Sequence, residues 1–542
     1  MSQSIPVAEA ASPRITRGQW MTLLAAFLGW MFDGFEMGLF PQVGRESLKT
    51  LLGTAYQEQL ASHWMGIMTA VFLIGAATGG VIFGWLGDRI GRVRAMTFSV
   101  LTYALFMGAC GLAQTPEQML FLRFFSALGM GGEWSLGVAL VMELWPNKTR
   151  GLLAGLIGAA ANVGFFMTAV VTFGMGRFLP TLQGWLFDGG PRAGWRLALV
   201  ENSAWRLMLL VGAAPALLTF FIRLLVPESE RWQREHAQGK TSHWATRDLL
   251  GVVVGILGLF GIIFVWTPGI WHGADVPRTF QAIGSVTGFL VALAGFIYPV
   301  LRYLQRSRAQ GEGWPVGKTL GRMLLGAALS GVAFVATWGA VQWGPIWAGI
   351  LVEQQMRATT VAESPASPAD EAAFKDSEVF KASVAKAASD ARSQTQMISG
   401  IGAIIGTLAG ALVGNLIGRR LTYTLLCASS FLVTLAFFQL NKTFGVQFLI
   451  ISFGVGALTA SFYGWLPLYL PELFPTNIRA TGQGFGFNFG RILAAIGALQ
   501  FGNLVKYFGG YPGACSTIVT VYLLGMVIIW AAPETRGQPL PE

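Results

Sequence analysis

The chain has 542 residues, of which 53% are hydrophobic and 12% are charged, and its mean hydropathy is +0.55. Soluble domains carry roughly 25% charged residues, so this composition excludes a soluble globular protein and indicates a polytopic membrane protein. The net charge of +10 does not indicate nucleic-acid binding, because cytoplasmic loops of membrane proteins collect Lys and Arg. Cys110, Cys427 and Cys515 each lie inside an apolar run. We therefore expect buried cysteines, and neither disulfides nor a metal site.

The N-terminal tail, residues 1–19, is polar, and the first apolar run is long and contains acids, so we do not expect a cleaved signal peptide. Apolar stretches of about 20 residues predict membrane-spanning helices. Six such stretches form a first set, at 20–40, 64–86, 95–113, 119–143, 150–174 and 205–226. Six more form a second set, at 321–351, 397–418, 421–440, 444–470, 479–507 and 511–532.

Two further apolar runs, at 249–271 and 279–304, lie between the two sets and raise the expected total to fourteen spans. The predicted fold is therefore all-α and consists of two six-helix bundles and an additional central helix pair. The first bundle covers 20–232, the linker with the extra pair covers 233–318, and the second bundle covers 319–532. The polar segment 353–395 is expected to be an external, partly helical loop, and 533–542 a cytoplasmic tail.

An even number of spans places both termini on one side of the membrane. The basic residues that fall on that side outnumber those on the other, so both termini are expected in the cytoplasm of an inner-membrane protein. The bias is imperfect, since the opposite side holds Arg45, Lys49, Arg177, Arg192, Arg196 and Lys442. The basic residues on the terminal side include Arg89, Arg92, Arg94, Lys148, Arg150, Arg231, Arg234, Lys240, Arg247, Arg302, Arg306, Arg308, Arg419, Arg420 and Arg479.

The most informative loop is GWLGDRIGRVR, between the second and third predicted spans. Glycines allow tight turns and close backbone approach, and the arginines fit a cytoplasmic turn. The string resembles the hallmark loop of the major facilitator superfamily, G-x-L-[AG]-D-R-x-G-R-[KR], although the last basic residue is displaced to Arg94. The residues that match are Gly84, Leu86, Gly87, Asp88, Arg89, Gly91 and Arg92. An ordinary cytoplasmic loop would need neither the aspartate nor this glycine spacing.

A repeat links the two halves of the sequence. Glu143 begins an E-L-W-P string that is followed by Arg150, and Glu472 begins an E-L-F-P string that is followed by Arg479 with the same spacing. The offset is close to the one that relates Gly91-Arg92 to Gly418-Arg419, with Asn415 in the place of Asp88. A parallel repeat of two six-helix halves is expected for this superfamily. The resemblance assigns to these loop residues a role in the conformational gate of the transport cycle.

Four ionisable side chains fall near the middle of predicted spans, namely Asp33, Glu36, Glu133 and Arg491. Each costs roughly 2.5–3.5 kcal/mol there, which calls for a functional reason. The three acids are proton-coupling candidates, because a desolvated carboxylate can bind and release a proton as the cavity alternates. Alternatively, Glu133 and Arg491 neutralise each other and hold the halves together. Arg123 is expected to be a packed or snorkelling arginine.

The glycine-rich stretch that ends at Arg491 is predicted to form a ligand-binding wall. Gln483, Asn488 and Arg491 offer hydrogen-bond donors that suit a carboxylate or a hydroxylated substrate. The alternative is a packing face whose polar residues bond between helices. The aromatic run Phe462, Tyr463, Trp465 and Tyr469 could line a sugar-like pocket, but aromatic residues are also common near membrane interfaces, so it receives no predicted role.

Several chemistries have no support in the sequence. There is no G-x-x-x-x-G-K-[ST] string for ATP hydrolysis, and the four histidines lack the spacing of a metal site or a catalytic triad. We therefore expect no enzyme activity, no cofactor and no metal, and a proton gradient as the energy source. The expected partners are the lipid bilayer, protons and a small-molecule substrate, with no nucleic acid, and the protein is expected to be a monomer.

The branch of the superfamily is suggested by weaker strings. Phe32-Asp33-Gly34-Phe35-Glu36 resembles the D-G-F-[DE] signature of acid-anion symporters, and Gly129–Trp134 is similar to the fourth span of bacterial sialic-acid carriers. This resemblance implies proton-coupled import of a small organic anion, such as a sugar acid, by alternating access. The strings PESERW after Val226 and PETRG after Ala532 resemble sugar-porter signatures. A neutral sugar porter or an uncoupled facilitator therefore stays open as an alternative.

Overall fold

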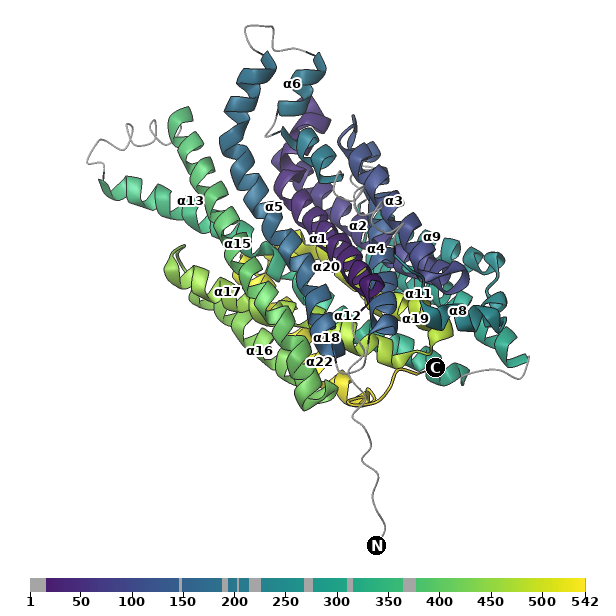
Figure 1. The fold of residues 1–542 in the computed structure, drawn as a ribbon. Coiled ribbons are helices and arrows are strands. Elements are labelled where there is room, and N and C mark those ends of the chain that lie inside the picture. Colours follow the sequence, from purple (N-terminus) through teal and green to yellow (C-terminus); the bar gives the residue numbers. More distant parts are fainter. Residues whose placement is uncertain are drawn as a thin grey trace.

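The computed structural model describes residues 16–145, 149–187, 194–201, 204–213, 226–267, 276–309, 315–363 and 377–541. Every regular element within these ranges is a helix. The helices run roughly side by side, and the first described residues lie at the same end of the bundle as the C-terminal segment (Figure 1). The expected all-α fold is therefore confirmed for this part of the chain.

Within the described residues, the first half contains the long helices α1 to α5, the short helix α6 and part of a further helix at residues 205–213. Their close contacts are made through small residues. Gly79 of the second helix and Gly129 and Gly131 of the fourth approach neighbouring backbones so closely that an added Cβ would lie 2.5 Å or less from a backbone atom, which is how small residues let membrane helices pack. The helices are α1 (Arg17–Leu52), α2 (Glu58–Ile90), α3 (Arg92–Cys110), α4 (Pro116–Leu144), α5 (Arg150–Phe187) and α6 (Gly194–Val200).

The second half has the corresponding helices, several of them in pieces. The predicted span 479–507 is broken at Phe489-Gly490 into two helices, and α5 continues well past the predicted end of its span. The helices are α12 (Val316–Gly339), α13 (Gly344–Glu363), α15 (Glu378–Ile417), α16 (Arg419–Leu440), α17 (Val446–Ala460), α18 (Phe462–Tyr469), α19 (Arg479–Asn488), α20 (Arg491–Tyr507), α21 (Tyr511–Ile518) and α22 (Val521–Ile528).

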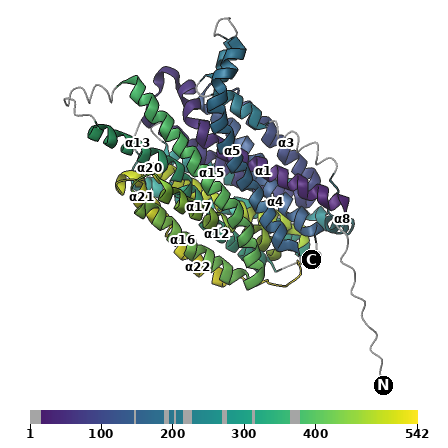
Figure 2. The same cartoon turned by 60° about the vertical axis from the view of Figure 1, so that its left-hand side comes forward.

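Between the halves lie α8 (Glu230–Ala237), α9 (Leu249–Trp266) and α11 (Arg278–Ala309). Helices α9 and α11 form a hairpin that packs against α2 of the first half and against α12, α19 and α20 of the second. Figure 2 turns the molecule and shows α15, α16 and α17 of the second half beside α5 and α1 of the first. The two halves meet directly where α2 contacts α19 and where α5 contacts α15.

Within the described residues, twelve helical segments are long and apolar enough to cross a membrane, and α9 and α11 are two of them. The predicted span 205–226 lies partly outside the described residues, and 479–507 is divided by its break, so the total of fourteen stays a prediction. The predicted external loop 353–395 is helical where it is described, because α13 extends to Glu363 and α15 begins at Glu378. The three cysteines are free and buried, as expected.

Candidate functional site

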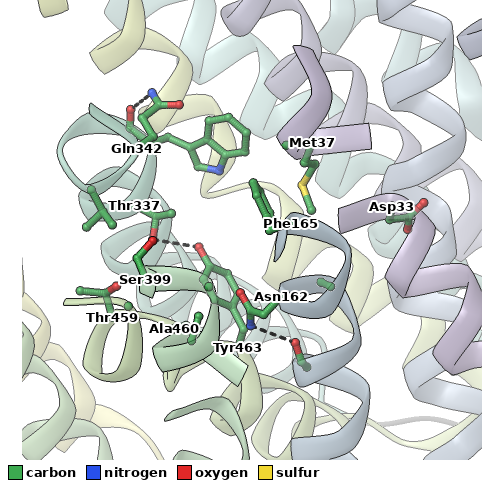
Figure 3. A pocket seen from close by; sticks show the side chains of 18 of the residues that line it. Asp33, Met37, Asn162, Phe165, Thr337, Gln342, Ser399, Thr459, Ala460 and Tyr463 are labelled. Atoms are coloured by element: carbon green, nitrogen blue, oxygen red, sulfur yellow. Dashed lines mark hydrogen bonds between the residues drawn. The ribbon is translucent and has the colours of Figure 1, made fainter. Parts of the chain in front are cut away.

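A central cavity of about 220 Å³ lies between the two halves. The first half contributes residues of α1, α4 and α5, and the second half contributes residues of α12, α13, α15, α17, α18, α19 and α20. Figure 3 shows Asp33 and Met37 on one side of this cavity and Thr337, Ser399 and Tyr463 on the other. A cavity between the halves is where a substrate site of a two-bundle carrier is expected.

Aromatic side chains dominate the wall of this cavity. Trp134 of α4 and Phe487 of α19 stack across the two halves with their ring centroids 3.5 Å apart, and Trp30 stacks on Trp134 at 5.6 Å. Phe334 meets the edge of Phe487 at 4.9 Å. Polar side chains are a minority of the wall, and besides Asp33 and Arg491 they are Asn162, Thr337, Gln342, Gln396, Ser399, Thr459 and Tyr463. The wall therefore favours a ligand with a flat apolar surface and a small number of polar groups.

Arg491 is the cation of the cavity wall. It is the first residue of α20, is 5% exposed, and its guanidinium lies over the rings of Phe334 and Phe487 at 4.8 and 5.5 Å. Its Nε and Nη1 atoms have no hydrogen-bond partner among the described residues. A buried cation held mainly by aromatic rings can still form charge-assisted hydrogen bonds with a ligand anion.

The three predicted acids have different surroundings. Asp33 lines the cavity, whereas Glu36 is fully buried behind it and pairs with Arg123 of α4 at 3.4 Å. Arg123 also lies over the Phe40 ring at 3.7 Å, so it is a packed arginine, as expected, and a counter-ion as well. A second arginine therefore shares the neutralisation of the acids, which the sequence had left to Arg491 alone. Glu133 is buried on α4 and does not line the cavity.

Asn488 and Gln483 are completely buried and do not line the cavity. The Asn488 amide donates to Gly131 O of α4 at 3.2 Å, and the Gln483 amide donates to Ser135 O of the same helix. Each therefore bonds α19 of the second half to α4 of the first. This arrangement matches the packing alternative, and their predicted substrate contact stays a prediction.

The predicted gate residues gather at one end of the molecule, which we call the gate end. We define the first gate cluster as Asp88, Arg92, Glu143 and Arg479. Arg92 pairs with Asp88 at 2.9 Å and with Glu143 at 3.3 Å, and Arg479 of the second half pairs with Glu143 at 2.9 Å. All four side chains are nearly or completely buried. The cluster therefore joins the halves through a cross-half ion pair.

Asp88 makes a second connection between the halves. Its carboxylate accepts hydrogen bonds from Thr481 N at 2.8 Å, Thr481 Oγ1 at 2.6 Å and Ala480 N at 3.3 Å. These donors lie in the first turn of α19, where unpaired amides and the positive end of the helix dipole favour an anion. The aspartate of the hallmark loop thus caps a helix of the opposite half.

The glycines and Arg89 of the hallmark loop have separate functions. A Cβ added to Gly84 would lie 2.8 Å from Ala480 O, so glycine lets α2 and α19 meet. Gly91 has φ +108°, a conformation that favours glycine. Arg89 does not join the first gate cluster, because its guanidinium donates to Thr246 Oγ1 at 2.5 Å, in the turn before α9.

A second gate cluster, Arg419, Glu472, Thr535 and Arg150, repeats part of this geometry. Arg419 pairs with Glu472 at 2.6 Å, and the Thr535 hydroxyl donates to Glu472 at 2.5 Å, as the Ser229 hydroxyl does to Glu143 in the first half. Gly418 has φ +100°, close to that of Gly91. Arg150 is 3% exposed, and its Nε and Nη2 atoms are without a hydrogen-bond partner in the described part of the chain.

Two glutamates for which the sequence predicts no role accept backbone hydrogen bonds next to the two clusters. Glu228 accepts from the amides of Arg92 and Val93, and Glu534 accepts from the amides of Arg419 and Arg420. Both belong to the PES and PET strings, which were the signal that could have found them. Partial burial raises the pKa of Glu534, but the backbone hydrogen bonds outweigh burial and hold it below its ordinary value of 4.5. Of the unassigned aromatic run, Tyr463 lines the cavity, whereas Trp465 and Tyr469 are buried elsewhere.

Comparison with known proteins agrees with this arrangement. Residues 21–252 and 377–542 match the family described as "Sugar (and other) transporter". The chain therefore belongs to this family, which is a branch of the major facilitator superfamily, and it is a membrane transporter and not an enzyme.

Its relatives include carriers of organic acids and their derivatives. A probable 4-methylmuconolactone transporter of Cupriavidus pinatubonensis is 24% identical and covers 98% of this chain and 93% of its own. A cis,cis-muconate transport protein of Acinetobacter baylyi is 29% identical over 41% of this chain and 46% of its own. The solved structure of the proton:xylose symporter XylE has a TM-score of 0.63 at 17% identity, covering 96% of this chain and 97% of its own. The human organic anion transporter TETRAN has a TM-score of 0.52 at 15% identity, with coverages of 94% and 99%.

Proposed function

We propose that this protein imports a small organic anion together with protons, by alternating access around the central cavity. The observation that carries the proposal is Arg491, a buried cation on the cavity wall whose Nε and Nη1 atoms have no hydrogen-bond partner in the part of the chain that the structure describes. Charge at this depth is costly, and a substrate carboxylate would compensate it with two parallel hydrogen bonds. The aromatic wall and the relatives named for muconate and muconolactone support an unsaturated or ring-containing acid over a polyhydroxylated one.

Asp33 is the proton carrier in this proposal, because it is the acid that lines the same cavity as Arg491 and acts on it electrostatically. Protonation of Asp33 from the outside would release Arg491 for the substrate anion. The halves would then rock, and loss of both proton and substrate on the other side would return the arginine to the influence of Asp33. Glu36, already paired with Arg123, would keep its charge through this cycle, and Glu133 would have a secondary role.

The orientation belongs to the same proposal. The start of α1 and the C-terminal segment both contact the gate end, since the Gln19 amide donates to Leu144 O at 2.7 Å and Arg479 donates to Pro541 O at 2.6 Å. The excess of basic residues at this end favours the cytoplasmic side. With the first gate cluster closed, the structure would correspond to a state whose cavity is sealed from the cytoplasm, in a monomer with fourteen spans in the inner membrane.

The decisive experiment is a competition panel on reconstituted protein, in which unsaturated acids, sugar acids and neutral sugars compete for uptake. Arg491→Lys should weaken anion binding by about tenfold or more, because lysine keeps the charge but lacks the planar fork that matches a carboxylate. Asp33→Asn should preserve exchange across the membrane and abolish uphill accumulation. Uptake that concentrates the anion without a proton gradient would contradict proton coupling.

A neutral sugar is the second candidate substrate, favoured by the family that matches the chain and by the PES and PET strings. Under that alternative, neutral sugars compete as well as acids do, and Arg491→Gln retains its affinity. The same panel therefore decides between the two candidates.

A further inference from the structure

Helices α9 and α11 form a tightly packed hairpin that touches both halves of the carrier. A Cβ added to Gly295 of α11 would lie 2.3 Å from Gly251 O of α9, and one added to Gly288 would lie 2.5 Å from Gly258 O. Backbones that approach this closely pack as one body. At the gate end, Trp244 stacks on Tyr303 with centroids 4.3 Å apart, and Asp248 pairs with Arg306.

On the first half, the hairpin meets α4 through an aromatic contact. Phe260 of α9 lies 5.5 Å from Phe124 of α4, measured between ring centroids. Phe124 adjoins Arg123, the counter-ion of Glu36. The hairpin is therefore attached to the helix that also carries Glu133 and Trp134.

On the second half, the hairpin meets the break between α19 and α20. Phe289 and Phe296 of α11 contact the Phe489 ring with centroid distances of 5.4 and 6.1 Å. Phe489 is 3% exposed and also stacks on Phe485 at 4.7 Å. Phe489 is therefore enclosed by aromatic rings from two elements.

Helix α12 also contacts the break. A Cβ added to Gly490 would lie 2.5 Å from the Cα and N atoms of Gly331, so the two backbones are in contact. Arg491 follows immediately as the first residue of α20. Arg491, the cation of the cavity wall, therefore follows directly after a helix break that both α11 and α12 contact.

We propose that the α9–α11 hairpin positions Arg491 through Phe489, so that a helix pair outside the cavity tunes anion binding inside it. Phe289 and Phe489 are positioning residues in this proposal, since neither lines the cavity. The effect on transport rests on the proposed function, in which Arg491 binds the substrate anion. The geometric part of the inference, the control of residue 491 by α11, can be tested without knowing the substrate.

The geometric test places a cysteine at the cation position. Arg491→Cys is made in a background in which Cys110, Cys427 and Cys515 are replaced by serine, and its reaction with the anionic reagent 2-sulfonatoethyl methanethiosulfonate is timed. Adding Phe289→Ala should change the rate by about threefold or more, because the aromatic contact with Phe489 is lost. The matched control is Phe280→Ala, which removes a ring of the same helix that is 58% exposed. Equal rates in the two double variants overturn the inference.

The functional test separates this inference from the proposed function. With cis,cis-muconate as the probe, Phe289→Ala and Phe489→Leu should raise KM by about three- to tenfold with little change in maximal rate, and Phe280→Ala should leave KM unchanged. An altered labelling rate combined with an Arg491→Gln variant that still binds carboxylates would support the positioning of residue 491 and overturn the proposed function instead. Loss of carboxylate binding in Arg491→Gln with unaltered KM in both phenylalanine variants would overturn the inference alone.

Discussion

The two gate clusters have the same sequence pattern, but they make different contacts between the two halves of the molecule. In both, a glycine with positive φ precedes an arginine, a buried glutamate pairs with that arginine, and a glutamate after the last helix of the half accepts backbone amides. Among the described residues, only the first cluster contains an ion pair between the halves, formed by Glu143 and Arg479. In the second, Arg150 is buried with two nitrogen atoms lacking hydrogen-bond partners among the described residues.

A single replacement accompanies this difference. Asp88 is fully buried and caps α19, whereas its counterpart Asn415 is exposed beside the first turn of α5, where a Cβ on Gly151 would lie 3.0 Å from Asn415 Cβ. An asparagine carries no charge to balance helix-end amides or an arginine. At the gate end the first cluster therefore joins the halves by an ion pair and a helix cap, whereas in the second cluster Arg150 of the first half lies near Glu472 of the second half with two of its nitrogen atoms unbonded among the described residues.

The largest effect is expected from Glu143→Gln. This change leaves Arg92 and Arg479 buried without their shared carboxylate, and breaking a buried pair costs about 3–5 kcal/mol. We expect a lower melting temperature and faster labelling of a cysteine placed at Ala480, which is buried at the gate. Glu472→Gln is the matched variant of the second cluster. It should lower the melting temperature as well but leave labelling at residue 480 near the wild-type rate, and similar labelling in both variants would refute the asymmetry.

A smaller effect is expected from Asp88→Asn. The amide can still accept hydrogen bonds from the first turn of α19, but it loses the charge that pairs with Arg92 and favours the helix terminus. Hydrogen bonds to charged groups contribute about 1.5–3 kcal/mol, so labelling at residue 480 should rise by about tenfold or more. Labelling that stays at the wild-type rate would show that Asp88 does not hold the gate closed.

The converse change, Asn415→Asp, should strengthen the second cluster. The new carboxylate would lie near the N-terminus of α5 and four residues before Arg419. A favourable charge at an exposed helix terminus contributes about 0.3–1 kcal/mol, so gate opening should become about two- to fivefold less frequent. The measurement is again the labelling rate at residue 480, and an increase would contradict the repeat-based comparison.

The smallest effect concerns Glu534 and pH. Because hydrogen bonds hold the pKa of this carboxylate below 4.5, its contribution to stability is complete above pH 4.5 and is lost as the pH falls through the lower pKa of the folded state. The melting temperatures of wild type and Glu534→Gln should therefore differ at neutral pH and converge as the pH falls through the folded-state pKa of Glu534. A difference that grows as the pH falls would reverse the sign of this argument.

The sequence alone determined the class of protein, because hydrophobicity over twenty-residue windows, the D-R-x-G-R loop and the repeated E-L-[WF]-P strings are local patterns. It also placed Asp33, Glu36, Glu133 and Arg491 as the costly intramembrane charges, since depth in a helix follows from counting residues. It could not say which way each side chain faces. Glu36 lies three residues from Asp33 but pairs with Arg123 behind the cavity wall.

Only the tertiary structure decided which residues meet across the halves. Gln483 and Asn488 look like ligand residues in sequence, yet both donate to carbonyl groups of α4, because α19 packs against that helix. Trp134 stacks on Phe487, and Phe289 of α11 contacts Phe489, so each contact joins residues that are far apart in the sequence. Such contacts depend on how helices pack in three dimensions, and periodicity within one helix carries no information about its neighbour.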